Sequence, residues 1–210
     1  MHKLNLTIAG LLVLATIGCQ EYAETALTPG QQKKVSAHIL ATAPTPQHTL
    51  GAIIEDQVKL IGYDIDKVSV KAGEELTVTY YIEALAEVMD DNMVFVHLQG
   101  RKNDRQAWMN LDHHLVEGLL PLRKLKKGQV VKDVHRIRVK PGFTSGRATI
   151  FWGLWRGQNR LKISNAKEVP HDKEGRVIVA KVKIDGKPGT KRKSKQTRAI
   201  QLQANESIVI

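Results

Sequence analysis

The chain has 210 residues, 42% of them hydrophobic, which is enough for one good-sized domain with extensions or for two small ones. A composition of this kind excludes a chain too polar to bury a core. Its formal net charge of +11 favours anionic partners such as phosphate headgroups, acidic glycans or nucleic acid.

The N-terminal segment, residues 1–18, has the pattern of a secretory signal peptide. The start MHKLN carries one lysine, an uncharged apolar stretch follows to Ile17, and Gly18 is a small residue at the processing point. The apolar stretch is shorter than the about 20 residues that a helix needs to cross a bilayer. A buried helix is the alternative, but no amphipathic pattern favours it.

Cys19 follows directly and is the only cysteine, so an exported chain cannot use it for an internal disulfide. The segment TIGC at residues 16–19 resembles the bacterial lipobox, although Thr16 stands where leucine is commonest. The resemblance implies that Cys19 is lipidated and becomes the new N-terminus, anchored to a membrane by several acyl chains. Gln20 resembles the pattern exported to the outer membrane of Gram-negative bacteria. An ordinary secretory signal remains the alternative.

Residues 19–55 are predicted to form a lipidated tether. They lack a clear hydrophobic period and contain several prolines among Thr, Ala and Gln. One short helix is expected within them, at residues 30–40.

Short β-type segments separated by turn residues occupy residues 56–185. Residues 75–83 alternate with a period of two, which predicts a half-buried strand, and residues 93–99 are apolar on both faces, as in a central strand. Residues 82–88 are compatible with a helical turn instead. Further strands are predicted at residues 105–111, 130–139, 147–155, 159–164 and 176–184. Seven to nine short strands at this spacing predict an all-β, antiparallel β-sandwich.

Residues 186–210 are expected to be a basic linker with a strand-like end, which can lead to a further domain downstream. Within them, residues 187–198 hold six Lys or Arg and no acid. A solvated linker is the simplest interpretation, because like charges repel. The functional alternative is contact with anionic lipid or polysaccharide through Lys191, Arg192, Lys193 and Lys195. Nucleic acid is not expected, because no stacking aromatics interleave with these charges.

Several phrases occur in a fixed order between residues 60 and 184. They include LIGYD at 60–64, VKAGEELTV at 70–78, VFVHL at 94–98, DH at 112–113 and GLW at 153–155. In this order they resemble a β-sandwich module of bacterial envelope proteins, which also forms the C-terminal part of some membrane glycosyltransferases. The resemblance implies an immunoglobulin-like or carbohydrate-module-like sandwich that is accessory to another activity. His114 departs from the pattern of such modules.

The segment LDHHLVEG at residues 111–118 is the part of the chain most similar to a reactive site. Zinc takes about four His, Cys or acidic ligands, whereas His113 and His114 point to opposite faces if the segment is a strand. Convergence of His97 or His135 with either of them is not visible in sequence. We therefore predict no metal and no cofactor, and expect Asp112 and His113 to form the polar edge of a binding surface.

Aromatic residues give the main indication of binding. Alternation along FWGLW, residues 151–155, places Trp152 in the core and Trp155 on the opposite face with Arg147. Exposed aromatic rings can stack on sugars or pack against a partner. The predicted binding surface consists of Trp108, Asp112, His113, Arg147 and Trp155.

No catalytic spacing is apparent. The sequence shows no pairing of carboxylates for glycoside hydrolysis and no G-x-S-x-G motif, so we do not expect an enzyme. The leading hypothesis is a membrane-anchored extracytoplasmic lipoprotein of the outer membrane of a Gram-negative bacterium. It would act as a non-catalytic binding or assembly module for an envelope protein or glycan. The alternatives are a carbohydrate-binding module that uses Trp108 and Trp155, and a metal-dependent hydrolase.

Overall fold

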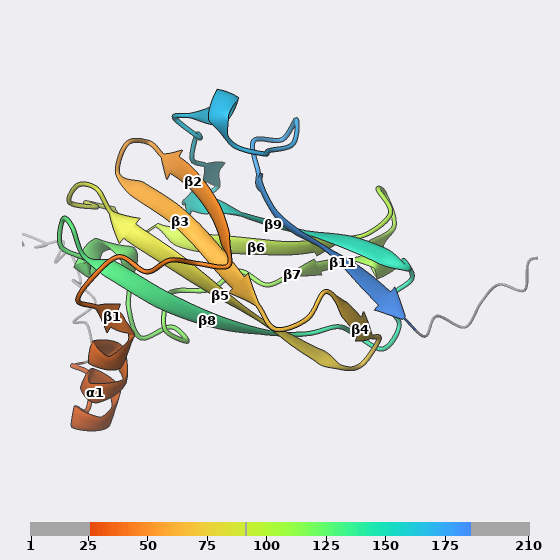
Figure 1. The fold of residues 1–210 in the computed structure, drawn as a ribbon, viewed down its shortest axis with the longest axis horizontal. Helices are drawn as coiled ribbons and strands as arrows, with labels where there is room; N and C mark the ends of the chain where they lie inside the picture. The colour runs from red at the N-terminus through yellow and green to blue at the C-terminus, as the bar shows by residue number, and fades with distance from the viewer. Residues whose placement is uncertain (1–25, 91, 186–210) are drawn as a thin grey trace, which may run out of the picture.

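The computed structural model describes residues 26–90 and 92–185 of the chain. In this part, eleven β-strands form two sheets that face each other across a core, with one α-helix beside them (Figure 1). The predicted all-β sandwich is therefore confirmed. The strands outnumber the seven to nine expected because four of the eleven contain only two or three residues. The pairing is antiparallel except between β4 and β11, which run parallel.

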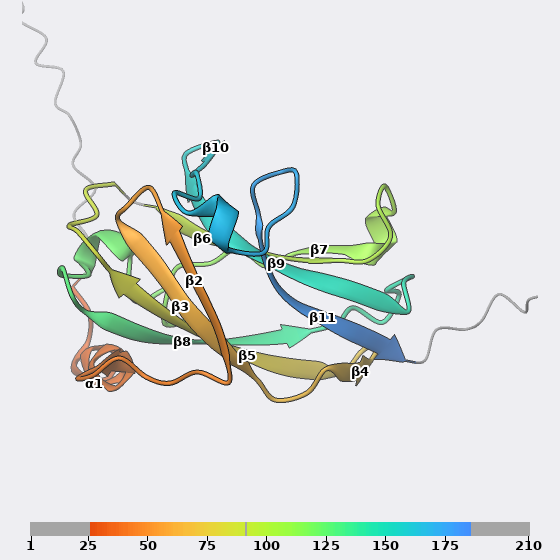
Figure 2. The ribbon, with the colours of Figure 1, turned by 45° about the horizontal axis from the view of Figure 1, so that its top comes forward.

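The first sheet consists of β1 (Ile39–Leu40), β8 (Val130–Arg138), β5 (Glu75–Ala84), β3 (Val58–Ile65) and β2 (His48–Ile54), in that spatial order. The second sheet consists of β4 (Ser69–Lys71), β11 (Val177–Asp185), β9 (Arg147–Arg156), β6 (Met93–Gln99) and β7 (Trp108–Asn110). β10 (Asn159–Arg160) pairs with β9, and the segment between β10 and β11 rises over one end of the second sheet (Figure 2). Short 3-10 turns occupy Arg105–Ala107, Leu122–Lys124 and Ala166–Glu168.

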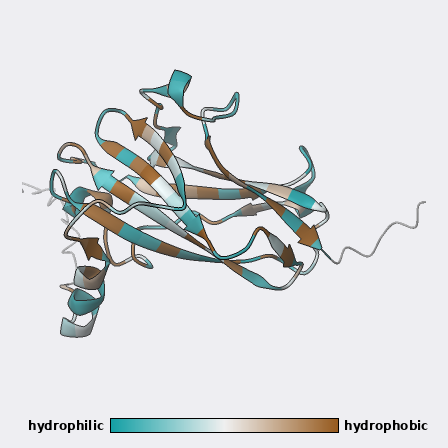
Figure 3. Ribbon diagram, viewed as in Figure 1, coloured by the Kyte–Doolittle hydropathy of each residue, from teal (hydrophilic) through white to brown (hydrophobic). Residues whose placement is uncertain are grey.

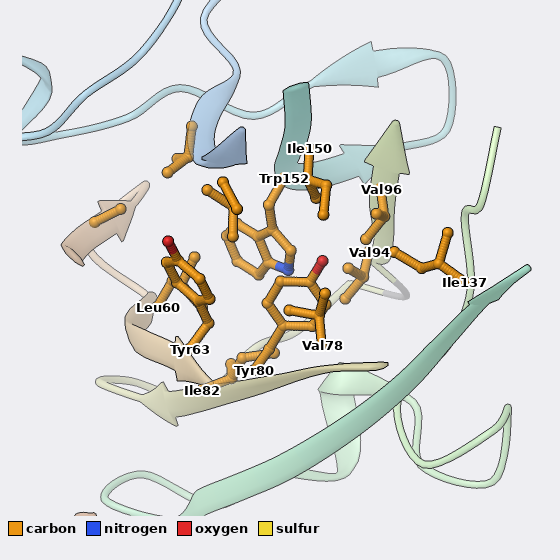
Figure 4. Close-up of a cluster of buried hydrophobic side chains, with 14 of the residues drawn as sticks. Leu60, Tyr63, Val78, Tyr80, Ile82, Val94, Val96, Ile137, Ile150 and Trp152 are labelled. Carbon is orange, nitrogen blue, oxygen red and sulfur yellow. The ribbon is translucent and has the colours of Figure 1, made fainter. Parts of the chain in front are cut away.

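Side chains that alternate along the strands build the core between the sheets, and Figure 3 shows this alternation as bands along the ribbons. On β5 the side chains that face inward are fully buried, namely those of Leu76, Val78, Tyr80 and Ile82. Trp152 of β9 is also fully buried and lies among side chains from both sheets (Figure 4). The period of two therefore predicted the inward faces of β5 and β9 correctly.

Two predicted strands are shorter than expected. In residues 105–111 the first three form a 3-10 turn, because the Asp104 side chain accepts a hydrogen bond from the backbone N–H of Gln106. Of residues 159–164, only β10 is a strand. The alternative of a helical turn at residues 82–88 is not found, since β5 continues to Ala84 and bends follow.

The sandwich begins well before residue 56, which was the predicted start of the domain. β1 pairs with β8, and β2 pairs with β3 and buries Ala52 and Ile54 in the core. The register of β2 shifts between Thr49 and Ala52, where Gly51 adopts a positive φ of 68°. This bulge interrupts the alternation of apolar and polar residues, so the sequence pattern of this proline-containing segment does not indicate a strand.

The helix expected at residues 30–40 is confirmed as α1 (Pro29–His38), which lies beside β1 and β8. Thr28 and Gln31 form a reciprocal capping box at its N-terminus, and Pro29 occupies the first turn. None of its residues is buried, so capping rather than packing explains where it begins.

Among the described residues, no helix combines the length and apolar character needed to cross a membrane. The predicted signal peptide, Cys19 and the basic residues Lys191, Arg192, Lys193 and Lys195 lie outside the described residues. Lipid anchoring and an anionic contact through these lysines and this arginine therefore stay predictions.

Candidate functional site

The outer face of the second sheet, which points away from the core, carries a cluster of aromatic and charged side chains. Phe95 on β6 and Phe151 on β9 are buried, although neither belongs to the core cluster. Two arginines from the chain between β9 and β11 cover them. The Arg160 guanidinium lies 5.0 Å from the centre of the Phe95 ring, and that of Arg176 lies 3.9 Å from the centre of the Phe151 ring. Both contacts are favourable cation–π interactions.

Phe95 is seated directly over a glycine. It pairs across the sheet with Gly153, and a Cβ built on Gly153 would lie 2.2 Å from Phe95 Cζ. The ring centre of Trp155 is 5.3 Å from that of Phe95, and Arg160 contacts both rings. Gly153 therefore leaves the space that the Phe95 ring occupies.

Arg176 is only 4% exposed and its guanidinium is held from several sides. Its Nε and Nη2 atoms donate to Asp172 Oδ2 at 2.8 and 2.6 Å, and Nη1 donates to Gln99 Oε1 at 2.8 Å. Burial raises the pKa of Asp172, but the hydrogen bonds from Arg176 outweigh it and hold that pKa below its usual value. The pair is therefore a fixed, charged element of the site.

Asp112 is fixed by the second sheet itself. Its Oδ1 atom accepts the backbone N–H of Val96 at 3.2 Å, and its Oδ2 atom accepts the indole N–H of Trp155 at 3.2 Å. His97 Nε2 lies 3.6 Å from Asp112 Oδ1. Burial lowers the pKa of His97 despite this carboxylate, and the charge of Arg176 lowers it further. The imidazole of His97 is accordingly neutral at pH 7.

These side chains surround a groove of about 470 Å³, which we call the Trp108 groove. Its lining residues are His97, Gln99, Lys102, Asn103, Trp108, Asn110, Asp112, Trp155, Arg160, Glu174 and Arg176. Trp108 is 39% exposed, and its ring centre is 5.6 Å from that of His97. A large indole ring is thus open to solvent next to fixed polar groups.

The structure brings together three of the five predicted binding residues, Trp108, Asp112 and Trp155, in the Trp108 groove. Arg147 lies on the same face but lines another groove, of about 590 Å³. His97 was not predicted on this surface; it pairs with Phe151 across the sheet, and alternation on β6 places it on the same face as Phe95. Arg160 and Arg176 were not predicted either, because no local pattern indicates which loop arginine returns to a sheet.

His113 does not line the Trp108 groove but reaches the core-facing side of β8. Its Nε2 atom lies 2.8 Å from Asp133 Oδ2, and its Nδ1 atom lies 3.0 Å from the Leu111 carbonyl oxygen. Because both ring nitrogens face acceptors, this position favours the imidazolium. The predicted polar edge is therefore divided, with Asp112 in the groove and His113 between the sheets.

Two half-buried histidines lie next to each other here, and their pKa values shift in opposite directions. The rings of His113 and His135 meet edge to face, 4.1 Å between centres. Burial lowers the pKa of His113, but the hydrogen bond and charge of Asp133 outweigh it and raise that pKa above its usual value. Burial and the charge of His113 lower the pKa of His135 to about 4. Within residues 26–90 and 92–185, no three metal-ligating side chains converge.

We expect His135→Phe to make the fold less sensitive to acid. The pKa of His135 is about 4 in the folded chain and about 6.5 when unfolded, so its contribution to stability is lost as pH falls from about 6.5 towards 4. Between pH 7 and pH 5, the variant should lose about 2 kcal/mol less unfolding free energy than the wild type. Urea unfolding at several pH values measures this. His48→Phe, at an exposed ring stacked on Tyr63, is the control and should behave as the wild type. An unchanged pH slope in His135→Phe would assign the acid sensitivity to another group.

Taken together, fold and site define an all-β sandwich with a ligand-sized groove on the outer face of one sheet. No family model matches the chain, and no curated protein matches it. Among solved structures, the chain is similar to AvmM, which is described as catalysing macrocyclization in alchivemycin A biosynthesis. The two are 16% identical, with a TM-score of 0.33 over 70% of this chain and 99% of AvmM. A TM-score this low carries no inference about function.

Proposed function

We propose that the protein is a lipid-anchored extracytoplasmic module that binds a carbohydrate in the Trp108 groove and has no catalytic role. The observation that carries the proposal is the exposed indole of Trp108 beside fixed polar groups in one groove. Sugar rings stack on aromatic faces, and a few placed polar groups orient a ligand. Gln99, Asn110 and Glu174 supply donors and acceptors around that ring.

The fixed geometry of the groove supports binding. Arg176 is held by Asp172 and Gln99, and Asp112 is held by Val96 and Trp155. Side chains that are already ordered lose little conformational entropy when a ligand arrives. The groove volume of about 470 Å³ also lies in the range of small-molecule sites rather than of a flat protein interface.

The contacts made by the ionisable side chains of Asp112 and His97 favour a non-catalytic role. Both carboxylate oxygens of Asp112 accept hydrogen bonds from the protein, and His97 is buried at the base of the groove between Phe95 and Trp108. These groups are held by contacts within the protein, and they shape the wall of the groove beside Trp108. The proposed anchor depends on the lipobox-like segment that ends at Cys19, and it would hold the groove near the membrane surface.

Trp108→Ala should weaken binding to a carbohydrate by about ten- to thirtyfold, because a tryptophan at the centre of a site often contributes most of the contact energy. Affinity would be measured against an array of soluble neutral and acidic polysaccharides, followed by calorimetry on those retained. Since Trp108 is 39% exposed and outside the core cluster, the variant should unfold as the wild type does.

The control for this variant is Met89→Ala, which removes another exposed apolar side chain, 79% exposed and not among the residues that line the groove. It should bind as the wild type. Wild-type affinity in Trp108→Ala, or no retention on any polysaccharide at millimolar concentration, would contradict the proposal.

A further inference from the structure

A row of like charges crosses the outer face of the second sheet at the end away from Trp155. Arg147 on β9 is directly opposite Lys183 on β11, and Lys181 is opposite Thr149, the next outward residue of β9. Arg101, just beyond the end of β6, lines the same groove. We call the groove of about 590 Å³ that these four side chains line the cationic groove.

This arrangement opposes stability unless something binds to it. Like charges directly opposite each other on neighbouring strands are destabilising, and surfaces without a ligand usually mix the two signs. Lys183 has an acidic partner, Asp185, at 2.7 Å. Among the described residues, neither Arg147 nor Lys181 forms an ion pair. Positive charge gathered in a hollow raises the local concentration of anions.

The cationic groove adjoins the Trp108 groove. Gln99 lines both, and a smaller hollow of about 340 Å³ shares residues with each of them; it is lined by Gln99, Arg101, Asn103, Asp104, Arg105 and Trp108. Along β9, the eight residue steps from Trp155 to Arg147 correspond to roughly 27 Å at the usual rise of a strand. A single ion or monosaccharide would fill only one end, whereas a polymer can occupy both.

We infer that the ligand is an acidic polysaccharide, and this inference rests on the function proposed above. A sugar unit lies against Trp108, and carboxylate, sulfate or phosphate groups farther along the polymer bind Arg101, Arg147 and Lys181. Arginine suits planar, bidentate contact with such groups, and lysine acts as a point charge. The cationic groove thus selects the charge of the ligand, and the Trp108 groove binds its ring.

Dextran, carboxymethyl dextran and dextran sulfate share one backbone and differ in charge, so they separate the two contributions. The purified full-length protein should bind the two charged polymers at least about tenfold more tightly than dextran at low salt, and added salt should reduce the difference. The double variant Arg147→Ala/Lys181→Ala should weaken binding of the charged polymers by about ten- to a hundredfold, because two charge-assisted contacts are lost. Its affinity for dextran should not change.

Lys126→Ala/Lys127→Ala is the matched control, because it removes two exposed lysines from a turn that precedes the first-sheet strand β8. It changes the net charge by the same amount and should bind all three polymers as the wild type does. If this control lost as much affinity as Arg147→Ala/Lys181→Ala, net charge alone would attract the polymer. That result would overturn the inference.

Other outcomes separate this inference from the proposed function. Equal affinity for dextran and for its charged forms, with loss in Trp108→Ala, overturns the acidic ligand and leaves the carbohydrate function standing. Binding of charged polymers that needs Arg147 and Lys181 but not Trp108 overturns the carbohydrate function. Vesicles of phosphatidylglycerol and phosphatidylcholine that bind through the same two cations and displace dextran sulfate would make the occupant a lipid surface.

Discussion

Asp133→Ala should lower the free energy of unfolding by about 3–5 kcal/mol, because it removes one partner of a buried ion pair. Asp133 is 1% exposed on the core-facing side of β8 and accepts hydrogen bonds from His113 and from the backbone N–H of Val116. Without the carboxylate, both donors are left in the protein interior without this acceptor. The contact also links the first sheet to the loop that leaves the second sheet.

That loop has a strained backbone, which increases its dependence on Asp133. Val116 and Glu117 have positive φ values of 55° and 56°, and Val116 is β-branched. Left-handed conformations cost roughly 1–2 kcal/mol for an ordinary residue, and the hydrogen bond from the Val116 N–H helps to keep this conformation. The expected loss therefore includes release of the loop as well as the missing pair.

Chemical denaturation of Asp133→Ala measures the loss, with Glu87→Ala as the control at an exposed acid, expected within about 0.5 kcal/mol of the wild type. The pH dependence of the unfolding free energy gives a second measurement. Because the pKa of His113 is raised in the folded chain, the contribution of His113 to stability is present below about pH 6.5 and is lost as pH rises through the folded pKa. This dependence should disappear in the variant. A loss below about 1 kcal/mol would contradict the assignment.

Gly153→Ala should destabilise the protein by about 2–3 kcal/mol, the upper part of the range for overpacking. The new Cβ would lie 2.2 Å from Phe95 Cζ, and that ring is fully buried beneath Arg160 and beside Trp155. A shift of the ring would disturb both contacts. We therefore expect the Trp108 groove to be distorted and carbohydrate affinity to fall with stability.

Gly146→Ala is the matched control, because nothing lies within 4 Å of its built Cβ and its φ is not positive. It should be neutral or slightly stabilising. Phe95→Leu should partly rescue the stability of Gly153→Ala, since a smaller side chain accommodates the new methyl group. A double-mutant cycle gives this coupling, and additive effects would show that the two residues do not compete for the same space.

Part of the candidate site was predictable from sequence. Alternation on residues 147–155 placed Trp152 inward and Trp155 outward, and this agrees with β9 in the structure. The same rule applied to residues 93–99 places His97 on one face with Phe95. Because this segment is apolar on both faces, the pattern does not indicate which face is the outer one or which side chains cover that face. Trp108 was recognised as a candidate, although its segment was expected to be a longer strand.

Asp133 and Arg176 were not predicted from the sequence, and the physical reason is the same for both. A carboxylate in a strand or an arginine after a glycine is common, and contacts with residues far along the chain are needed to recognise either one as part of a buried cluster. Asp133 meets His113 from the other side of the sandwich, and Arg176 meets Gln99, which is 77 residues earlier. Burial of such groups is tolerated only when these long-range contacts form.

By itself the sequence determined the fold class and the inward faces of β5 and β9, because alternation depends on residues two apart. It also determined the net charge and the expectation of lipid attachment at Cys19, which is a local motif. Only the tertiary structure decided that Trp108, Asp112 and Trp155 share a groove, that His113 turns away from it, and that Arg147 faces Lys183. Strand order and register bring these residues together, and both depend on pairings between segments far apart in the chain.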